Sequence, residues 1–418
     1  MRIKTILSAL LLWAVCWPLS AQALTLRVTI PSGATSETTR MFANLFHQFE
    51  ESEPGVKIDF CPLTDWDDVV KEIQDRVDKG QSAGLFVAEL SETLELERKK
   101  LITPFGAVLS GNANEFTDRF IPEFLGNSYC STKEFCGPPF VRSTPVALYN
   151  LDNFRSIGLD KDHLPTTWGE LKSALEKLAA GQKGPPPFAL GGDWYDYLFE
   201  AMVRQAGGLL QDPQSLRVSF DTPEAVEALT FWKQLKDENL LRRTHNWKSA
   251  LNAFCSGLAA VTYYSSGGMD TVQQKADFPW MADRLPKNKI YSVAYGGGNL
   301  YLGPNLSQEE RQAALKLTNF LYSPHIQAQI SVGSGFFPVV KRAFDDPLLK
   351  ERYDTVEAYK RIKRQLQYAH PKLMTINFIE IRNILKRAID RTLDNGQDAK
   401  QSLDQAQQEA DQLLSQNG

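Results

Sequence analysis

Small residues stand where an apolar run ends, and they are the residues of this sequence best suited to hold a ligand. Residues 265–268, Ser-Ser-Gly-Gly, follow the apolar run 258–264 and precede a helical stretch at 269–276. Small residues at such a junction expose backbone N–H groups and hydroxyls, which together can bind an anion. Because an ordinary helix cap has the same composition, the pattern alone leaves both interpretations open.

A run of glycines at residues 296–298 precedes the strand expected at 300–303. Glycine has no Cβ and lets a ligand approach the backbone closely, although a flexible turn is the simpler interpretation. Neither run has a nucleophile with a base beside it. The chemistry indicated is therefore binding and not bond cleavage.

The sequence motifs of common enzymes do not occur in this chain. It contains no G-x-S-x-G, H-E-x-x-H or G-x-G-x-x-G motif and no P-loop, and its five histidines are scattered. Adjacent acids such as Asp67 and Asp68 usually cap or solvate helices. No second cysteine pair and no histidine pair accompanies Cys130 and Cys136 at the spacing of metal ligands. The sequence therefore predicts no catalytic residue, no metal site and no cofactor.

The elements that must position these residues alternate along the chain between strands and helices. Side chains alternate in character at 24–30, whereas the helices that follow carry apolar residues at helical spacing. Strands are expected at 24–30, 56–60, 85–90 and 146–150, and helices at 66–77, 168–179, 223–239, 248–256 and 399–414. This alternation predicts an α/β fold with a largely parallel sheet covered on both faces.

The length of the chain predicts two lobes. Its 418 residues exceed what one hydrophobic core normally supports. No Ser/Gly-rich or charged linker divides the chain, and the run Lys-Gly-Pro-Pro-Pro at 183–187 is too short to be one. We therefore expect lobes joined by several crossing strands, each assembled from separate parts of the sequence.

The N-terminus has the features of an export signal. Arg2 and Lys4 precede an apolar run at 6–17, and Ala-Gln-Ala at 21–23 is typical of a cleavage site. The apolar run is too short to span a membrane, so we expect residues 1–23 to be removed and the mature protein to be soluble. The formal net charge of −4 argues against nucleic acid or an anionic membrane as the main partner.

Two of the five cysteines lie close enough to pair. Cys130 and Cys136 flank five residues, a spacing that favours a disulfide across a hairpin over free thiols. Such a bond indicates an oxidising compartment. Cys61 and Cys255 have no evident partner, and buried small hydrophobic residues are their simplest interpretation.

Several short stretches form an ordered set along the chain. Phe-Ala-Asn-Leu-Phe-His-Gln-Phe-Glu stands at 42–50 and Pro-Thr-Thr-Trp-Gly-Glu-Leu at 165–171. They are followed by Ala-Phe-Cys-Ser-Gly-Leu-Ala-Ala at 253–260, Phe-Leu-Tyr-Ser-Pro at 320–324 and Gly-Phe-Phe-Pro-Val-Val-Lys at 335–341. In this order the stretches resemble the extracellular solute-binding proteins of ATP-driven importers, which include maltose-binding and glycerol-3-phosphate-binding proteins.

The resemblance implies a periplasmic-binding-protein-like α/β fold of two lobes joined by a multi-strand hinge. The expected division is 24–142 with 293–338 for the first lobe and 143–292 with 339–418 for the second. The hinge is expected near 141–144, 292–295 and 337–340. A ligand bound between the lobes favours the closed arrangement, because closing completes its contacts. The resemblance also implies a monomeric periplasmic receptor that is not an enzyme, with a small-molecule ligand and a membrane permease as partners.

The likeness is greatest to the family members that bind glycerol 3-phosphate, and it rests on segments 143–146, 265–267, 296–297 and 381–382. It implies that the phosphate and neighbouring oxygens are held by Ser143, Ser265, Gly297 and Arg382. Glu89 would accept hydrogen bonds from the glycerol hydroxyls. A guanidinium and hydroxyl donors suit a phosphate group. Without the likeness, Arg382 would be taken for a solvated charge on a helix face.

Aromatic residues leave the identity of the ligand open. Trp66 and Phe336 stand where the glycerol-phosphate receptors carry tyrosines, and Phe336 lacks a hydroxyl donor. A buried oxygen deprived of one partner costs about 1 to 3 kcal/mol. A glycerophosphodiester or a neutral di- or oligosaccharide is therefore an alternative ligand, and a secreted hydrolase is a more distant alternative. Trp194 stands where the family often has a pocket aromatic, and a core tryptophan is the equal alternative.

Overall fold

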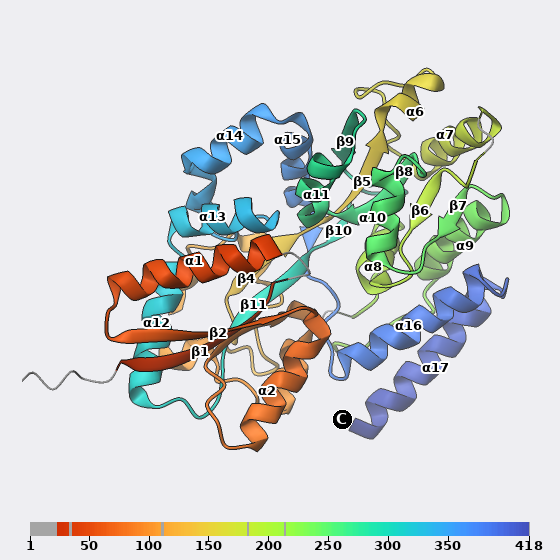
Figure 1. The fold of residues 1–418 in the computed structure, drawn as a ribbon. Helices are drawn as coiled ribbons and strands as arrows, with labels where there is room; N and C mark the ends of the chain where they lie inside the picture. The colour runs from red at the N-terminus through yellow and green to blue at the C-terminus, as the bar shows by residue number, and fades with distance from the viewer. Residues whose placement is uncertain (1–22, 33–35, 110–112, 182–183, 213–214, 418) are drawn as a thin grey trace, which may run out of the picture.

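The computed structural model describes residues 23–32, 36–109, 113–181, 184–212 and 215–417. The export signal expected at 1–23 lies outside these residues except for Ala23. Of the helices in the described ranges, none combines the length and the apolar character that a membrane crossing requires. The described chain forms two lobes, each built around a five-stranded sheet with helices packed on it (Figure 1).

The first lobe contains the sheet with strand order β2-β1-β3-β11-β4. Its strands are β1 (Leu24–Pro31), β2 (Val56–Leu63), β3 (Leu85–Glu89), β4 (Pro139–Ser143) and β11 (Gly296–Leu302). β1 pairs in parallel with β2 and β3, whereas β11 runs antiparallel to β3 and β4. All five residues of β3 are buried, because helices and loops cover both faces of the sheet at its centre.

The helices of the first lobe pack with apolar stripes against this sheet. In the first of them, Phe42, Leu45, Phe46 and Phe49 recur at helical spacing and are buried. The helices are α1 (Ser36–Ser52), η1 (Trp66–Asp68), α2 (Val69–Asp78), η2 (Leu90–Glu92), α3 (Thr93–Arg98), α4 (Phe105–Val108), α5 (Ala113–Thr117), η3 (Pro122–Leu125), α12 (Gln308–Leu321), α13 (Pro324–Ser334) and η5 (Lys341–Asp345).

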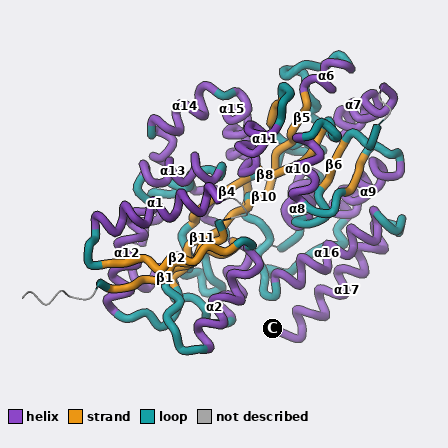
Figure 2. Tube along the Cα trace, in the orientation of Figure 1, coloured by secondary structure: helices purple, strands orange, loops and turns teal. Residues whose placement is uncertain are grey.

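The second lobe contains the sheet with strand order β7-β6-β8-β5-β9. Its strands are β5 (Pro145–Asn150), β6 (Phe188–Leu190), β7 (Leu241–Arg243), β8 (Val261–Ser265) and β9 (Trp280–Asp283). β6 pairs in parallel with β7 and β8, whereas β5 runs antiparallel to β8 and β9. Figure 2 shows the strands gathered in two groups, with helices around each group.

Most of the remaining helices belong to this second sheet. They are α6 (Leu151–Ser156), α7 (Trp168–Gly181), α8 (Tyr195–Gln205), α9 (Pro223–Asp237), α10 (Trp247–Cys255), η4 (Ser266–Gly268), α11 (Met269–Lys275), α15 (Glu357–Lys363), η6 (Arg364–Tyr368), α16 (Phe378–Leu393) and α17 (Ala399–Asn417), whereas α14 (Pro347–Thr355) packs on α13 and η5 of the first lobe as well as on α15. α16 and α17 form a hairpin that packs on α8 and α9 (Figure 1). The C-terminal helix expected at 399–414 is therefore confirmed, together with its packing on a lobe surface.

The chain crosses between the lobes more than once. Thr144 alone separates β4 of the first sheet from β5 of the second, and Tyr295 separates β10 (Val293–Ala294) from β11. β10 pairs in parallel with β12 (Ala369–His370). Each sheet is therefore assembled from separate parts of the sequence. The lobe boundaries given above remain a proposal.

The expectation of largely parallel sheets is confirmed for four strands of each sheet, and the fifth strand of each is reversed. The antiparallel pairs involve β11 in the first sheet and β5 in the second, and both strands adjoin a crossing between the lobes. In each sheet the reversed strand is the first one after the chain has crossed into that lobe. Alternation of strands and helices along the sequence carries no information about that direction.

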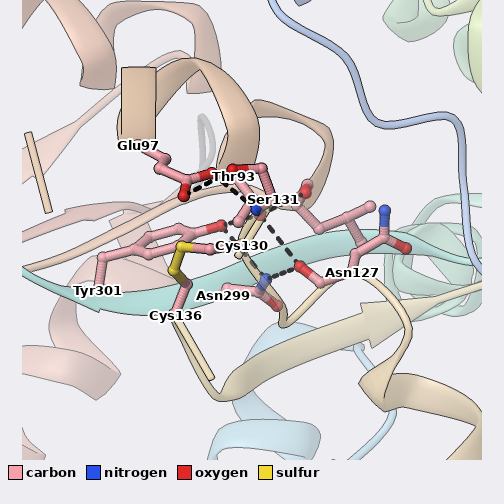
Figure 3. The surroundings of a disulfide bond; sticks show 9 residues. Thr93, Glu97, Asn127, Cys130, Ser131, Cys136, Asn299 and Tyr301 are labelled. Atoms are coloured by element: carbon pink, nitrogen blue, oxygen red, sulfur yellow. Dashed lines mark hydrogen bonds between the residues drawn. A yellow bond between two sulfur atoms is a disulfide. The ribbon is translucent and has the colours of Figure 1, made fainter. Parts of the chain in front are cut away.

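A disulfide joins Cys130 to Cys136, as the spacing of the two cysteines predicted, with their Cα atoms 5.5 Å apart. Both cysteines are buried. Between them, Ser131 donates its backbone N–H and its hydroxyl to the Glu97 carboxylate at 2.8 and 2.9 Å (Figure 3). Cys255 is a buried free thiol as expected, whereas Cys61 is only partly buried.

The loop that carries the disulfide is tied to the first sheet through Asn127. Its carbonyl accepts hydrogen bonds from the Thr93 hydroxyl at 3.0 Å and from Asn299 Nδ2 at 2.8 Å (Figure 3). The hydroxyls of Thr93 and Tyr301 are also hydrogen-bonded to each other, 2.6 Å apart. Because Asn299 and Tyr301 belong to β11, the disulfide loop is fixed against an interior strand of the first sheet.

Candidate functional site

An inner pocket of about 220 Å³ lies between the two lobes. Seven of the residues that line it are residues singled out in the sequence: Trp66, Glu89, Ser143, Trp194, Ser265, Gly297 and Phe336. The other four are Tyr197, Trp247, Gly296 and Lys372. Both lobes therefore contribute to its walls, which is the arrangement that a ligand-closed cleft requires.

Strand pairing explains why residues so far apart in the sequence meet in this pocket. Across the first sheet, Glu89 at the end of β3 faces Gly298, and Ser143 at the end of β4 faces Gly296. In the second sheet, Ser265 at the end of β8 faces Pro145, two residues beyond Ser143. The ends of β3, β4 and β8 and the start of β11 therefore converge at the junction of the lobes.

A second cavity of about 580 Å³, here called the outer cleft, adjoins the inner pocket. The two share Trp66, Trp247, Ser265 and Phe336 in their walls. Charged side chains in the wall of the outer cleft are Glu37, Lys248 and Lys275. A ligand longer than the inner pocket can accordingly extend into the outer cleft.

Hydroxyl groups line one side of the inner pocket. Ser143 Oγ lies 3.1 Å from the hydroxyl of Tyr197, a buried residue of α8. Ser265 Oγ accepts a hydrogen bond from the N–H of Gly267 at 3.2 Å and so caps η4. The capping interpretation of 265–268 therefore applies, and the same serine also lines the pocket. A hydroxyl has two lone pairs and a proton, so both roles are compatible.

The glycine run at 296–298 lies inside β11 and not in a turn before it. Gly297 has φ of +119°, and a Cβ placed on it would lie 2.1 Å from the carbonyl oxygen of Val141. A Cβ on Gly298 would lie 2.6 Å from the ring of Trp66. The expected strand therefore begins four residues earlier than 300, and its glycines let a pocket wall and a neighbouring strand approach the backbone.

Aromatic rings form much of the remaining wall. Trp247 stacks on Tyr264 with ring centroids 4.3 Å apart and lies 6.2 Å from the Tyr197 ring. Trp194 precedes α8 with φ of +54°, a left-handed conformation that is uncommon for a residue with a side chain. Its ring is covered by the Arg382 guanidinium, 4.7 Å from the ring centroid. Trp194 is therefore a pocket residue in this structure and not an interior core residue.

A charged cluster forms one end of the inner pocket. Lys372 Nζ lies 2.9 Å from Glu89 Oε1 and 2.5 Å from Asp196 Oδ2, and the side chains of all three residues are at most 6% exposed. Glu89 comes from the first lobe and Asp196 from α8 of the second. Burial lowers the pKa of Lys372, but the two carboxylates outweigh burial and hold the pKa well above its usual value. Lys372 is therefore a charged ammonium at neutral pH.

Arg382 lies beside the pocket and not among the residues that line it. Its Nη2 donates to the Asp67 carboxylate of η1, so the ion pair joins α16 of the second lobe to the first lobe. Its Nη1 is buried and has no hydrogen-bond partner in the described part of the chain. Burial lowers the pKa of Arg382, and the charges of Asp196 and Asp67 more than offset this effect.

Glu92 is a second buried carboxyl near this cluster. Its side chain is on η2, the residue is 2% exposed, and Oε2 has no hydrogen-bond partner among the described residues. Burial, followed by the charges of Glu89 and Asp67, raises the pKa of Glu92 well above its usual range. The carboxyl is therefore held in its protonated form more readily than an exposed glutamate.

Sequence reasoning missed Tyr197, Trp247 and Lys372. Tyr197 and Trp247 lie in apolar helices, where an aromatic residue is normally a core residue. Lys372 follows Pro371 in a connecting segment with no periodic pattern. No signal in the sequence distinguishes these residues from core or surface residues, because their place at the pocket depends on how distant elements pack together. Within the described chain, no group of three or more histidines, cysteines or acids could hold a metal ion.

Similar proteins are known for nearly the whole chain. The sn-glycerol-3-phosphate-binding periplasmic protein UgpB of Brucella abortus is 24% identical over 394 residues, which cover 90% of each chain. The protein of the same name from Escherichia coli K12 is 25% identical over 342 residues, 77% of each chain.

Solved structures show the same fold. UgpB from Mycobacterium tuberculosis in complex with glycerophosphocholine has a TM-score of 0.83 at 18% identity, covering 94% of this chain and 98% of that one. Maltose-bound MalE3 of T. maritima has a TM-score of 0.80 at 20% identity, covering 94% and 100%. The family model described as "Bacterial extracellular solute-binding protein" matches residues 44–356. This match spans more than half of the chain, and the protein therefore belongs to the bacterial extracellular solute-binding proteins, a family of binding proteins and not of enzymes.

Proposed function

We propose that this chain is the periplasmic receptor of an ATP-driven importer and that it captures a glycerophosphodiester between its lobes, with glycerol 3-phosphate as a weaker ligand. The observation that carries the proposal is that a small inner pocket, with hydroxyl and charged groups among its aromatic walls, adjoins a larger outer cleft. The inner pocket offers hydroxyl and backbone N–H donors to a glycerophosphoryl group. The outer cleft offers room for the group esterified to it.

The charge of the inner pocket supports a diester over a monoester. Among the described residues that line it, Glu89 and Lys372 carry opposite charges, and Asp196 behind Lys372 adds one negative charge. The charge of Arg382 beside the pocket is offset by its ion pair with Asp67. A phosphate monoester carries a charge of about −1.5 to −2 at neutral pH. A diester has no second ionisable oxygen and carries about one negative charge. A pocket without excess positive charge disfavours the more highly charged ligand.

The site residues are assigned roles within this proposal. Ser143, Ser265 and the N–H of Gly297 donate to phosphate oxygens, and Arg382 reaches the same group through its unpartnered Nη1. Glu89 accepts from a glycerol hydroxyl. Rings cover the carbon skeleton, and these are Trp66, Trp194 and Phe336. The relatives named above as glycerol-3-phosphate-binding proteins support this assignment.

A neutral di- or oligosaccharide is the second candidate ligand. The number of aromatic rings in the inner pocket favours it, because such rings stack on sugar faces, and maltose-bound MalE3 shares the fold. In this alternative Glu89 binds sugar hydroxyls and the phosphate donors bind other hydroxyls.

A thermal-shift panel decides between these ligands. The purified mature protein is melted with glycerophosphocholine, glycerol 3-phosphate, inorganic phosphate and maltose. A ligand at a hundred times its dissociation constant stabilises the native state by about 2.7 kcal/mol. For a chain of this length that corresponds to roughly 3 °C. We expect the largest shift with glycerophosphocholine. A shift with maltose alone would replace the proposal with the saccharide receptor.

A further inference from the structure

The segment 371–374, here called the strap, connects β12 to α16 and passes between the lobes. Its backbone is held by side chains from both lobes. Asn127 of the first lobe accepts from Lys372 N at 3.1 Å and donates to Lys372 O at 2.9 Å. Glu200 of α8 accepts from Leu373 N at 2.9 Å, and Gln211 exchanges two hydrogen bonds with Met374.

The strap therefore places one side chain with high precision. The Lys372 side chain is 1% exposed, and its ammonium ends in the inner pocket between Glu89 and Asp196. An ammonium has three N–H donors. Glu89 Oε1 accepts one of them, and Asp196 Oδ2 forms an ion pair with the same nitrogen, which leaves a donor for an atom in the pocket.

We propose that Lys372 contacts the ligand directly, donating its third N–H to a ligand oxygen, and that it couples ligand binding to the closed arrangement of the lobes. The coupling follows from where its partners lie. In the division given above Lys372 and Asp196 are in the second lobe and Glu89 is in the first, so the ammonium keeps its contact with Glu89 only when the lobes are together. A ligand oxygen on the same nitrogen then has its strongest contact in that arrangement. The inference rests on the proposed function, since it concerns the same pocket.

Two variants separate a ligand contact from a purely structural ion pair. Lys372→Met removes the ammonium and keeps the length of the side chain. Asp196→Asn removes one partner of the ammonium from a position that does not line the pocket. If Lys372 only stabilises the fold, Lys372→Met breaks both of its ion pairs and Asp196→Asn breaks one of them, so both variants lower affinity. If Lys372 contacts an anionic ligand, Asp196→Asn leaves the ammonium in place with less competing negative charge.

Affinity is measured by titration calorimetry with glycerophosphocholine. We expect Lys372→Met to weaken binding at least tenfold and Asp196→Asn to leave it unchanged or tighten it. Lys386→Met is the matched control, because Lys386 also pairs with an acid, Asp390, but lies outside the pocket. It should bind within twofold of the unaltered protein. A loss of more than twofold in Asp196→Asn, or undiminished affinity in Lys372→Met, would overturn the proposal.

The test stays decisive in two difficult cases. If Lys372→Met does not fold, Lys372→Gln combined with Asp196→Asn removes both charges of the ion pair together, and the tenfold loss is still expected. If the unaltered protein binds maltose and no phosphodiester, the proposed function has failed, and the same variants are titrated with maltose. A tenfold loss with Lys372→Met then supports Lys372 as a donor to a hydroxyl, whereas unchanged affinity refutes it independently.

Discussion

Replacing Gly297 by alanine is expected to destabilise the junction of the lobes strongly. Its φ of +119° lies in a region that residues with a Cβ rarely adopt, which costs about 1 to 3 kcal/mol. The new Cβ would also lie 2.1 Å from the carbonyl oxygen of Val141, a backbone atom of β4. Forcing an extra carbon into packed structure costs about 1 to 3 kcal/mol more. The expected total is roughly 2 to 6 kcal/mol.

The assay is thermal unfolding followed by calorimetry without ligand. For a chain of this length, 1 kcal/mol changes the melting temperature by about 1 °C, so Gly297→Ala should melt roughly 2 to 6 °C lower. Gly169→Ala is the matched control, because no atom lies within 4 Å of its Cβ and the residue stands in the helix α7. Alanine there should be neutral or stabilising by about 1 kcal/mol at most. Equal melting temperatures for both variants would refute the reasoning.

Three further outcomes are expected. The double variant Cys130→Ser, Cys136→Ser opens a short loop and should lower the free energy of unfolding by about 2 kcal/mol, measured as a fall in melting temperature. An unchanged melting temperature would show that the loop is held by its hydrogen bonds alone. Burial raises the pKa of Glu92 in the native state, so the native state loses stability as pH rises above the pKa that this carboxyl has in the unfolded chain. The melting temperature of Glu92→Gln, relative to that of the unaltered protein, should therefore rise between pH 5 and 8. A difference in melting temperature that stays constant with pH would contradict this. Arg382→Ala should weaken binding of a phosphate ligand at least tenfold. Its melting temperature should fall by about 1 °C at most, because the ion-pair partner Asp67 is 40% exposed. Undiminished calorimetric affinity would exclude a contact between Arg382 and the phosphate.

Much of the fold could be predicted from local patterns. The expected strands at 24–30 and 56–60 match β1 and β2, and the helix expected at 168–179 matches α7, because alternation and helical spacing report burial directly. The direction of β5 and β11 could not be predicted. Strand direction depends on which lobe the chain has just left, and no local pattern encodes that.

The pocket could be predicted in part, and the reason differs from residue to residue. Ser143 and Ser265 each stand at the end of a strand, and the resemblance to a family locates such strand ends well. The position of Arg382 beside the pocket depends on its pairing with Asp67, more than 300 residues earlier in the chain. The position of Lys372 depends on a strap with no periodicity, held entirely by side chains of other elements. Such long-range contacts are absent from any single segment of sequence.

The place of β11 in the first sheet has a consequence for biosynthesis. This strand fills the gap between β3 and β4, although more than 150 residues are translated between β4 and β11. Until residue 302 has emerged from the ribosome, β3 and β4 have no partner along the edges that β11 will occupy. Unpaired strand edges are prone to association with other chains. The first lobe therefore completes its sheet late, after the strands of the second lobe's sheet have been translated.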